Sequence, residues 1–332
     1  MTTGSTSGAR PFLVAEAPQR FGAELSRRWQ WKQRCSRAGL HLFDRSTGLN
    51  VLLDEVSVPS SRWSRAPRHV SIALTNQCDS TCSHCFAPKS SDELRFEVIK
   101  GWLAELDANG TLGVGFGGGE PTLHPDFVRL CQDAARETQL SVTFTTHGHH
   151  VDEALAERLR GSVHFVRVSM DGVGATYESI RRRPFCDLLS RLKIIQTICR
   201  FGINIIVNER TLGELDEVAA VAADAGACEL LLLPQMPTPG CDGIDSHALQ
   251  GLRRWVEAYR GSPRLCINEG SAEGFPTCNP LKEEHGLRAY AHVDAAGVLK
   301  RTSYRATGIV IAADGIMGAL DSLGREFREM DT

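Results

Sequence analysis

Residues 69–86 read HVSIALTNQCDSTCSHCF, a strand-like apolar stretch followed at once by three closely spaced cysteines. Cys78, Cys82 and Cys85 have the spacing C-x3-C-x2-C. Three thiolates on one short loop can hold three irons of a cuboidal iron–sulfur cluster, which leaves the fourth iron open to a ligand from outside the protein. The stretch therefore predicts a strand that ends in a metal-binding loop.

Two other interpretations of these cysteines stay open. In the first, zinc binds the three thiolates with His84 as fourth ligand, but His84 and Cys85 are adjacent, and neighbouring side chains rarely converge on one tetrahedral ion. In the second, the cysteines bind nothing. The chain has 11 cysteines, an odd number that cannot all pair internally, and in a reducing cytoplasm such cysteines are more often metal ligands, reactive thiols or core residues than disulfides.

A strand–helix alternation extends from this stretch to about residue 240. Apolar runs with a period of two are separated by segments that have apolar residues on one helical face. The segment 90–108 opens with a capping-box pattern at Ser90 and Glu93, and Pro125 stands at the expected first position of the next helix. The expected strands are 69–75, 112–116, 140–145, 163–169, 203–207 and 229–233. Successive βα units predict a parallel sheet with ligands bound at the carboxyl ends of its strands.

A glycine-rich turn follows the second expected strand. It reads Gly117-Gly118-Gly119-Glu120-Pro121. Glycines let the backbone approach a ligand closely, and a carboxylate can accept hydrogen bonds from an ammonium group. Alone, the turn is equally typical of any tight βα loop.

Taken together and in this order, the cysteine motif after the first strand and the GGEP turn after the second resemble the radical S-adenosylmethionine (SAM) superfamily. The resemblance covers about residues 67–240. The S-x-D-G segment from Ser169 to Gly172 and the arginine at 181 are similar to the branch that contains sulfatase-maturing and peptide-modifying enzymes. The resemblance implies a partial (β/α)6 TIM-like barrel, one [4Fe–4S] cluster and SAM as cofactors, and an electron donor of the flavodoxin or ferredoxin type.

The resemblance also implies a site. Cys78, Cys82 and Cys85 would hold the cluster. Backbone and side-chain groups of Gly118, Gly119 and Glu120 would bind the amino end of SAM, and Ser169 and Arg181 its ribose or carboxylate.

Two positions depart from the superfamily pattern. An aromatic residue usually precedes the third cysteine, whereas this chain has His84, whose imidazole could stack on adenine in its place; Phe86 is nearby. After the third strand, where T-N-G is common, the chain has Thr146-His147-Gly148. His147 is either a proton-transferring group of the substrate pocket or a hydrogen-bonded loop residue.

We divide the chain into three parts. Residues 1–66 form an N-terminal tail and a β-hairpin element at about 39–56, residues 67–240 form the barrel, and residues 241–332 form an α+β extension. In that extension a hairpin is expected at 288–304 and a helix near 314–328. The extension is similar to the cluster-binding extension of the peptide-modifying branch, but Thr302 and Ser303 stand where a cysteine is expected.

We therefore expect the extension to bind no auxiliary cluster. A cluster with ligands Cys241, Cys266 and Cys278 or borrowed cysteines is the alternative. Cys278 is either a hydrogen-atom donor to a substrate radical or a structural cysteine.

The resemblance implies a radical SAM enzyme that cleaves SAM to a 5′-deoxyadenosyl radical and abstracts a substrate hydrogen. The branch favours modification of a ribosomally made peptide by cross-linking, epimerisation or oxidation. The alternative is a tailoring epimerase or dehydrogenase of a sugar or amino acid, and a more remote one is a non-enzymatic iron–sulfur sensor or carrier.

Composition excludes other classes. Among 332 residues, 42% are hydrophobic and 23% charged, and the net charge is −3, so we expect a folded protein that binds neither nucleic acid nor membrane. The first 20 residues lack the pattern of an export signal, which favours a cytoplasmic location.

Overall fold

A ten-stranded sheet forms the centre of the structure, a computed structural model that describes residues 31–238 and 241–330. The strand order is β10-β9-β8-β7-β6-β5-β4-β11-β12-β13. Strands β4 to β11 run parallel, and β12 and β13 continue the sheet antiparallel. The strands are β4 (His69–Thr75), β5 (Gly113–Gly118), β6 (Ser141–Thr146), β7 (Phe165–Ser169), β8 (Phe201–Val207), β9 (Glu229–Pro234), β10 (Arg264–Ile267), β11 (Tyr290–Val293), β12 (Val298–Lys300) and β13 (Ile309–Val310).

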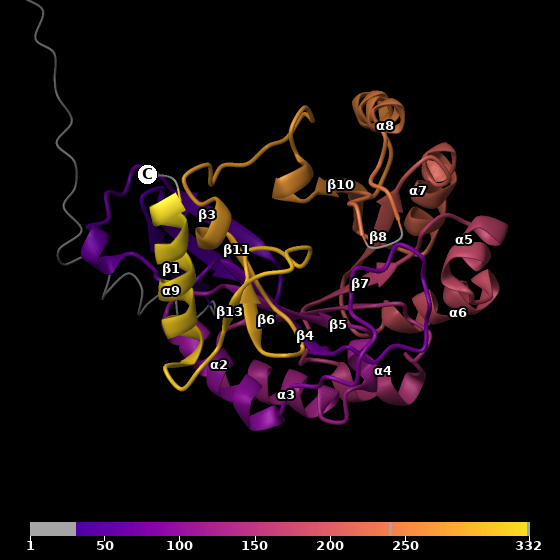
Figure 1. The fold of residues 1–332 in the computed structure, drawn as a ribbon. Helices are drawn as coiled ribbons and strands as arrows, with labels where there is room; N and C mark the ends of the chain where they lie inside the picture. The colour runs from indigo at the N-terminus through magenta and orange to yellow at the C-terminus, as the bar shows by residue number, and fades with distance from the viewer. Residues whose placement is uncertain (1–30, 239–240, 331–332) are drawn as a thin grey trace, which may run out of the picture.

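Helices cover the outer side of this curved sheet (Figure 1). They are α2 (Phe96–Ala108), α3 (Phe127–Glu137), α4 (Glu153–Leu159), α5 (Gly174–Arg181), α6 (Phe185–Ile195), α7 (Leu215–Asp224), α8 (Ser246–Ala258) and α9 (Gly315–Met330). The six strands and the repeated βα order expected from the sequence are confirmed, as is the predicted TIM-like partial barrel. The described strands form an open curved sheet, since β10 and β13 stand at its two ends.

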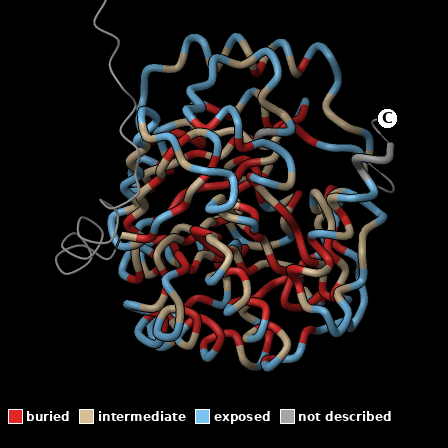
Figure 2. Tube along the Cα trace, turned by 90° about the vertical axis from the view of Figure 1, so that its left-hand side faces the viewer, coloured by how far each residue is buried: buried red, intermediate tan, exposed pale blue. Residues whose placement is uncertain are grey.

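The two faces of the sheet differ in chemistry. Side chains such as Val70, Ile72 and Leu74 of β4 are fully buried, and equivalent positions of the other parallel strands belong to the same core. Figure 2 shows the buried stretches of the chain gathered in the interior. The alternate residues line the inner face. One inner row crosses four strands in register and contains Ser169, Asn204, Leu231 and Cys266.

Two predicted helix starts were wrong. The helix expected from residue 90 begins at Phe96, because the chain before it pairs with the end of β4: the amide of Leu94 donates to the carbonyl of Leu74 at 2.9 Å. The hydroxyl of Ser90 donates to the Asp92 carboxylate at 2.6 Å and caps no helix. Pro125 precedes α3, which starts at Phe127, because Asp126 occupies the N-cap position.

The N-terminal part forms a separate three-stranded antiparallel sheet. Its strands are β1 (Trp31–Ser36), β2 (Gly39–Asp44) and β3 (Leu49–Leu53), and β2 and β3 are the predicted hairpin. In the extension, the predicted hairpin is β11–β12 and the predicted helix is α9. The extension also adds strands on both sides of the barrel strands, because β10 pairs with β9 and β11 pairs with β4. No helix among the described residues is long and apolar enough to span a membrane.

Candidate active site

The cysteine motif lies on the loop after β4, at the carboxyl ends of the parallel strands. Cys78, Cys82 and Cys85 are each half-buried. Burial raises the pKa of the Cys78 and Cys82 thiols, so a bound metal would have to stabilise their thiolates.

The glycine-rich turn after β5 packs directly against this loop. The amide of Gly119 donates to the carbonyl of Thr75 at 2.7 Å, and that of Glu120 to the carbonyl of Gln77 at 2.8 Å. A Cβ on Gly118 would lie 2.2 Å from the Thr75 carbonyl oxygen, and Gly118 has a φ of +127°. Only glycine therefore lets the two loops approach so closely. The structure thus brings together the two motifs that the sequence singled out.

Glu120 is almost completely buried, with 1% of its surface exposed. Its Oε1 accepts from the hydroxyls of Thr122 and Thr146, both at 2.7 Å, and from the Thr122 amide at 3.3 Å; its Oε2 accepts from the His147 amide at 2.9 Å. Nε2 of His147 lies 3.4 Å from the same Oε2, so both carboxylate oxygens already have protein donors beside them. Glu120 thus ties the ends of β5 and β6 together beside the cysteine loop.

His84 turns inward and is buried. Its Nε2 lies 3.2 Å from Oδ2 of Asp171, the aspartate of the S-x-D-G segment after β7. The same oxygen lies 2.5 Å from an Nη atom of Arg181, the last residue of α5. Burial alone would raise the pKa of Asp171, but Arg181 and then His84 lower it to about 2. The imidazole is held by this ion pair, whereas Phe86 is exposed and packs against Tyr304 with ring centroids 5.0 Å apart.

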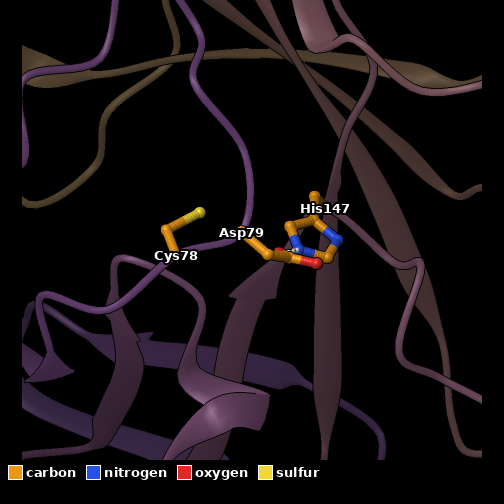
Figure 3. Close-up of side chains that lie close together, drawn as sticks. All are labelled: Cys78, Asp79 and His147. Carbon is orange, nitrogen blue, oxygen red and sulfur yellow. Dashed lines mark hydrogen bonds and ion pairs between the residues drawn. The ribbon is translucent and has the colours of Figure 1, made fainter.

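A second set of polar contacts, centred on Asp79, holds the start of the loop, and Figure 3 shows the carboxylate of Asp79 beside the ring of His147. Asp79 accepts from Nε2 of His147 at 2.9 Å and lies 3.0 Å from Nε2 of His150, and Arg183 forms an ion pair with the same carboxylate. Burial alone would raise the pKa of Asp79, but its neighbours His147, His150 and Arg183, with His147 contributing most, lower it to about 2. His147 is thus hydrogen-bonded in the loop after β6, and a proton-transferring role for it stays a prediction.

Cys78, Asp79 and His147 place a sulfur, an oxygen and a nitrogen within 4.8 Å of one another. These three atoms do not suit a single metal ion, because the neutral ring of His147 carries its proton on the nitrogen that would have to bind the metal. Nδ1 of His147 accepts the backbone N–H of His149 at 3.1 Å, so in the neutral ring the proton is on Nε2, which donates it to Asp79. A metal at Nε2 would require the opposite tautomer.

The remaining predicted residues lie in different places. Ser169 is half-buried on the inner row, at the carboxyl end of β7. Cys266 belongs to the same row three strands away, and Cys278 is exposed on the segment between β10 and β11. Cys241 is half-buried, and its sulfur accepts from the side-chain amide of Gln235 at 3.0 Å. Among the described residues, no group of three ligand side chains within reach of one ion includes any of the last three cysteines.

The donor set fits a cuboidal cluster better than zinc. A single tetrahedral ion needs ligand atoms that converge, and in the described part of the chain Cys82, His84 and Cys85 do not form such a group. A cuboidal cluster binds each thiolate to a different iron, so three separated, half-buried sulfurs on one loop suit it. Arg181 lies beside this loop, since an Nη atom is 3.7 Å from Sγ of Cys82, and its buried Nε–H has no hydrogen-bond partner among the described residues.

Comparisons with known proteins agree with this chemistry. The family model of the radical SAM superfamily matches residues 72–228, which contain the cysteine loop, the GGEP turn and the S-x-D-G segment. This part of the chain is a radical SAM domain. Such a domain takes a [4Fe–4S] cluster and SAM as cofactors. All eleven cysteines of this chain are free thiols, so the three cysteines of the motif form no disulfide.

Two relatives show how far the similarity extends. Mycofactocin maturase MftC of Mycobacterium tuberculosis (strain CDC 1551 / Oshkosh) is 31% identical over 172 residues, which cover 49% of this chain and 43% of MftC. AdoMet-dependent heme synthase of Methanosarcina barkeri is 28% identical over 189 residues, 54% of each chain. The radical SAM domain thus spans about half the length of the curated relatives it matches.

Solved structures extend the likeness of the fold beyond that domain. Streptococcus suis SuiB bound to precursor peptide SuiA matches with a TM-score of 0.71 over 90% of this chain and 89% of that chain, at 13% identity. The structure of anSMEcpe with bound AdoMet and Cp18Cys peptide matches with a TM-score of 0.60 over 78% of this chain and 82% of that one, at 17% identity. At these identities the match concerns the fold, including part of the extension.

Proposed function

We propose that the protein is a radical SAM enzyme that modifies a ribosomally made peptide. The observation that carries the proposal is the packing of the C-x3-C-x2-C loop against the GGEP turn at the carboxyl ends of the parallel strands. When bound and reduced, the cluster supplies the electron that cleaves SAM to methionine and a 5′-deoxyadenosyl radical, which takes a hydrogen atom from the substrate. The chain's own residues bind and orient the cofactors and the substrate, and they exclude water from the site.

Each predicted residue has a place in this proposal. Cys78, Cys82 and Cys85 hold three irons. The amino end of SAM lies at the Gly118-Gly119 turn, where Oε2 of Glu120 would accept from the ammonium group in place of its 3.4 Å contact with Nε2 of His147.

The other end of SAM lies towards β7. Nε of Arg181 is a buried donor without a partner among the described residues, which suits a carboxylate from outside the chain. Ser169 is the last residue of β7, and in this proposal its hydroxyl contacts the ribose.

The peptide as substrate is supported by the names of the relatives. MftC is a maturase, and the SuiB structure contains a precursor peptide. A small-molecule substrate is the second candidate, because the heme synthase and a GTP 3′,8-cyclase of Chlorobaculum tepidum, 28% identical over 138 residues, are also relatives. The same proposal includes a flavodoxin or ferredoxin as electron donor and a cytoplasmic location. It also includes Cys278 as hydrogen-atom donor, whose exposed thiol is accessible.

The test starts with anaerobic reconstitution. We expect about four irons per chain, no stoichiometric zinc, and formation of 5′-deoxyadenosine and methionine from SAM with dithionite as reductant. Cys82→Ala should lose the cluster, whereas Cys186→Ala, which removes an exposed cysteine outside the motif, should keep it.

A wild-type chain that holds four irons but does not cleave SAM would contradict the proposal. To separate the two substrate classes, the reconstituted enzyme is incubated with SAM and a precursor peptide encoded beside its gene. A mass change in the peptide supports the first candidate, and modification only of a sugar or amino acid supports the second.

A further inference from the structure

We propose that two cationic side chains, Arg181 and Lys89, set the reduction potential of the cluster by donating N–H groups to cysteine sulfurs, with Arg181 as the dominant one. The inference rests on the proposed cluster at Cys78, Cys82 and Cys85. It concerns positioning residues that act on the cluster through its ligands.

Each of the three sulfurs accepts one donor, and the three donors differ. Cys78 accepts the backbone N–H of Ser80 at 3.4 Å, which is a neutral donor. Cys82 accepts a guanidinium N–H of Arg181 at 3.7 Å, and Cys85 accepts an ammonium N–H of Lys89 at 3.7 Å. These lengths lie within the range of hydrogen bonds to sulfur, whose radius is larger than that of oxygen.

Arg181 is fixed in place. It is the last residue of α5, which ends because Arg182 adopts a left-handed conformation with a φ of 57°. One Nη atom pairs with Asp171, and the other faces Cys82. Asp171 is itself held by the amide of Ile206 at 2.8 Å, so the guanidinium is anchored to the ends of two strands. Its side chain is 13% exposed, and solvent therefore screens its charge only weakly.

Lys89 carries the same positive charge as Arg181, but its side chain lies at the surface. It is exposed, and its ammonium also donates to the Ser80 carbonyl at 3.2 Å, which bridges the two ends of the cysteine loop. Water and salt screen an exposed charge strongly. The contribution of Lys89 should therefore be smaller than that of Arg181 and should fall as ionic strength rises.

The sign of the change in the reduction potential follows from the charge of the cluster in its two oxidation states. Reduction adds one electron, and so one negative charge, to the cluster and its thiolates. Hydrogen bonds to the sulfurs and nearby positive charge stabilise the more negative state and raise the potential. Removing either cation should make the midpoint potential more negative, and removing the anionic partner of Arg181 by Asp171→Asn should make it less negative.

The experiment measures midpoint potentials of the reconstituted protein by EPR-monitored redox titration, without SAM or substrate. The variants are Arg181→Met and Lys89→Met, each at low and high salt. Arg183→Met is the matched control, because Arg183 is also a guanidinium beside the loop but pairs with Asp79 and donates to none of the three sulfurs in the contacts of the described residues. We expect the largest negative shift in Arg181→Met at both salt concentrations, and a smaller one in Lys89→Met that shrinks at high salt.

Three results would overturn the inference. These are an unchanged or less negative potential in Arg181→Met, an equal shift in Arg183→Met, and a shift in Lys89→Met that is insensitive to salt. If Arg181→Met assembles no cluster, Lys89→Met and Asp171→Asn decide by the sign of their shifts. A wild-type chain without a four-iron cluster would overturn the proposed function together with this inference, whereas equal potentials in all variants would overturn the inference alone.

Discussion

Replacing Arg34 by methionine should strongly destabilise the protein, because this buried guanidinium joins three parts of the chain. Arg34 lies on β1, and its Nε donates to Glu284 of the extension at 2.8 Å. One Nη atom donates to the carbonyls of Ala66 and Gly110 at 2.8 and 2.9 Å, and the other to the carbonyl of Arg288 at 3.1 Å. Both charged side chains are 2% exposed.

The size of the effect follows from what the substitution leaves behind. Glu284 would stay buried with Arg68, at 3.3 Å, as its one remaining charged partner among the described residues. The carbonyls of Ala66 and Gly110 would lose the Arg34 donor, and the carbonyl of Arg288 would keep only the amide of Arg68, at 2.8 Å. Removing one partner of a buried ion pair costs about 3–5 kcal/mol. With an unfolding entropy of about 2.1 cal/mol/K per residue over about 300 residues, that cost lowers Tm by about 5–8 °C.

The assay is urea unfolding of the cluster-free protein, followed by far-UV circular dichroism, together with a thermal scan. Arg37→Met is the matched control, because Arg37 forms an ion pair with Glu283 at 3.7 Å whose side chains are 70% and 53% exposed. An exposed pair contributes about 0–1 kcal/mol. A free energy of unfolding for Arg34→Met within about 1 kcal/mol of the wild type would refute the reasoning.

Two further predictions concern the extension and pH. Replacing Cys241, Cys266 and Cys278 together by alanine should leave the iron content unchanged, because these cysteines share no ligand group in the described structure; a loss of about four irons would show a second cluster. Burial lowers the pKa of His292 to about 4, so the unfolded state takes up the proton first as pH falls below about 6.5. The contribution of His292 to the free energy of unfolding should therefore fall by up to about 3 kcal/mol between pH 6.5 and 4, in addition to that of His69, His149 and His164, whose pKa values burial also lowers to about 4. Urea midpoints should show a weaker pH dependence in His292→Gln.

The barrel could be predicted because its strands carry a local pattern. In β4, Val70, Ile72 and Leu74 face the core, so the apolar residues alternate along the sequence as the side chains do. β1 has no such pattern. Its buried residues are Lys32, Arg34 and Ser36, and the charges of Lys32 and Arg34 pair with the distant residues Asp107 and Glu284. A periodicity analysis looks for apolar residues and so cannot find this strand.

β10 was missed for a different reason. It has four residues, Arg264–Ile267, and only one side of it is paired, to β9. So short a run is compatible with many conformations, and a parallel partner more than 30 residues away in sequence decides this one. The extension's contribution to the far edge of the barrel was therefore not predictable from local sequence.

In the candidate site, too, the sequence predicted some contacts, whereas others depend on residues far away in the chain. The order and spacing of the motifs predicted that the cysteine loop and the GGEP turn meet, because both follow parallel strands. The partner of His84 could not be predicted, since Asp171 is 87 residues away and by itself is typical of a turn or a helix cap. A histidine in a position that is usually aromatic was the one sign in the sequence that this side chain has another partner.

The contacts of the cysteine loop explain why the parallel sheet suits this chemistry. Asp79 is held by residues after β6, His84 by a residue after β7, and the start of the loop by the turn after β5. Three neighbouring strands thus fix one loop from three sides. Because these contacts are side-chain and backbone hydrogen bonds within the protein, the chain itself positions the sulfurs, and the proposed cluster would bind to a loop whose conformation these contacts already define.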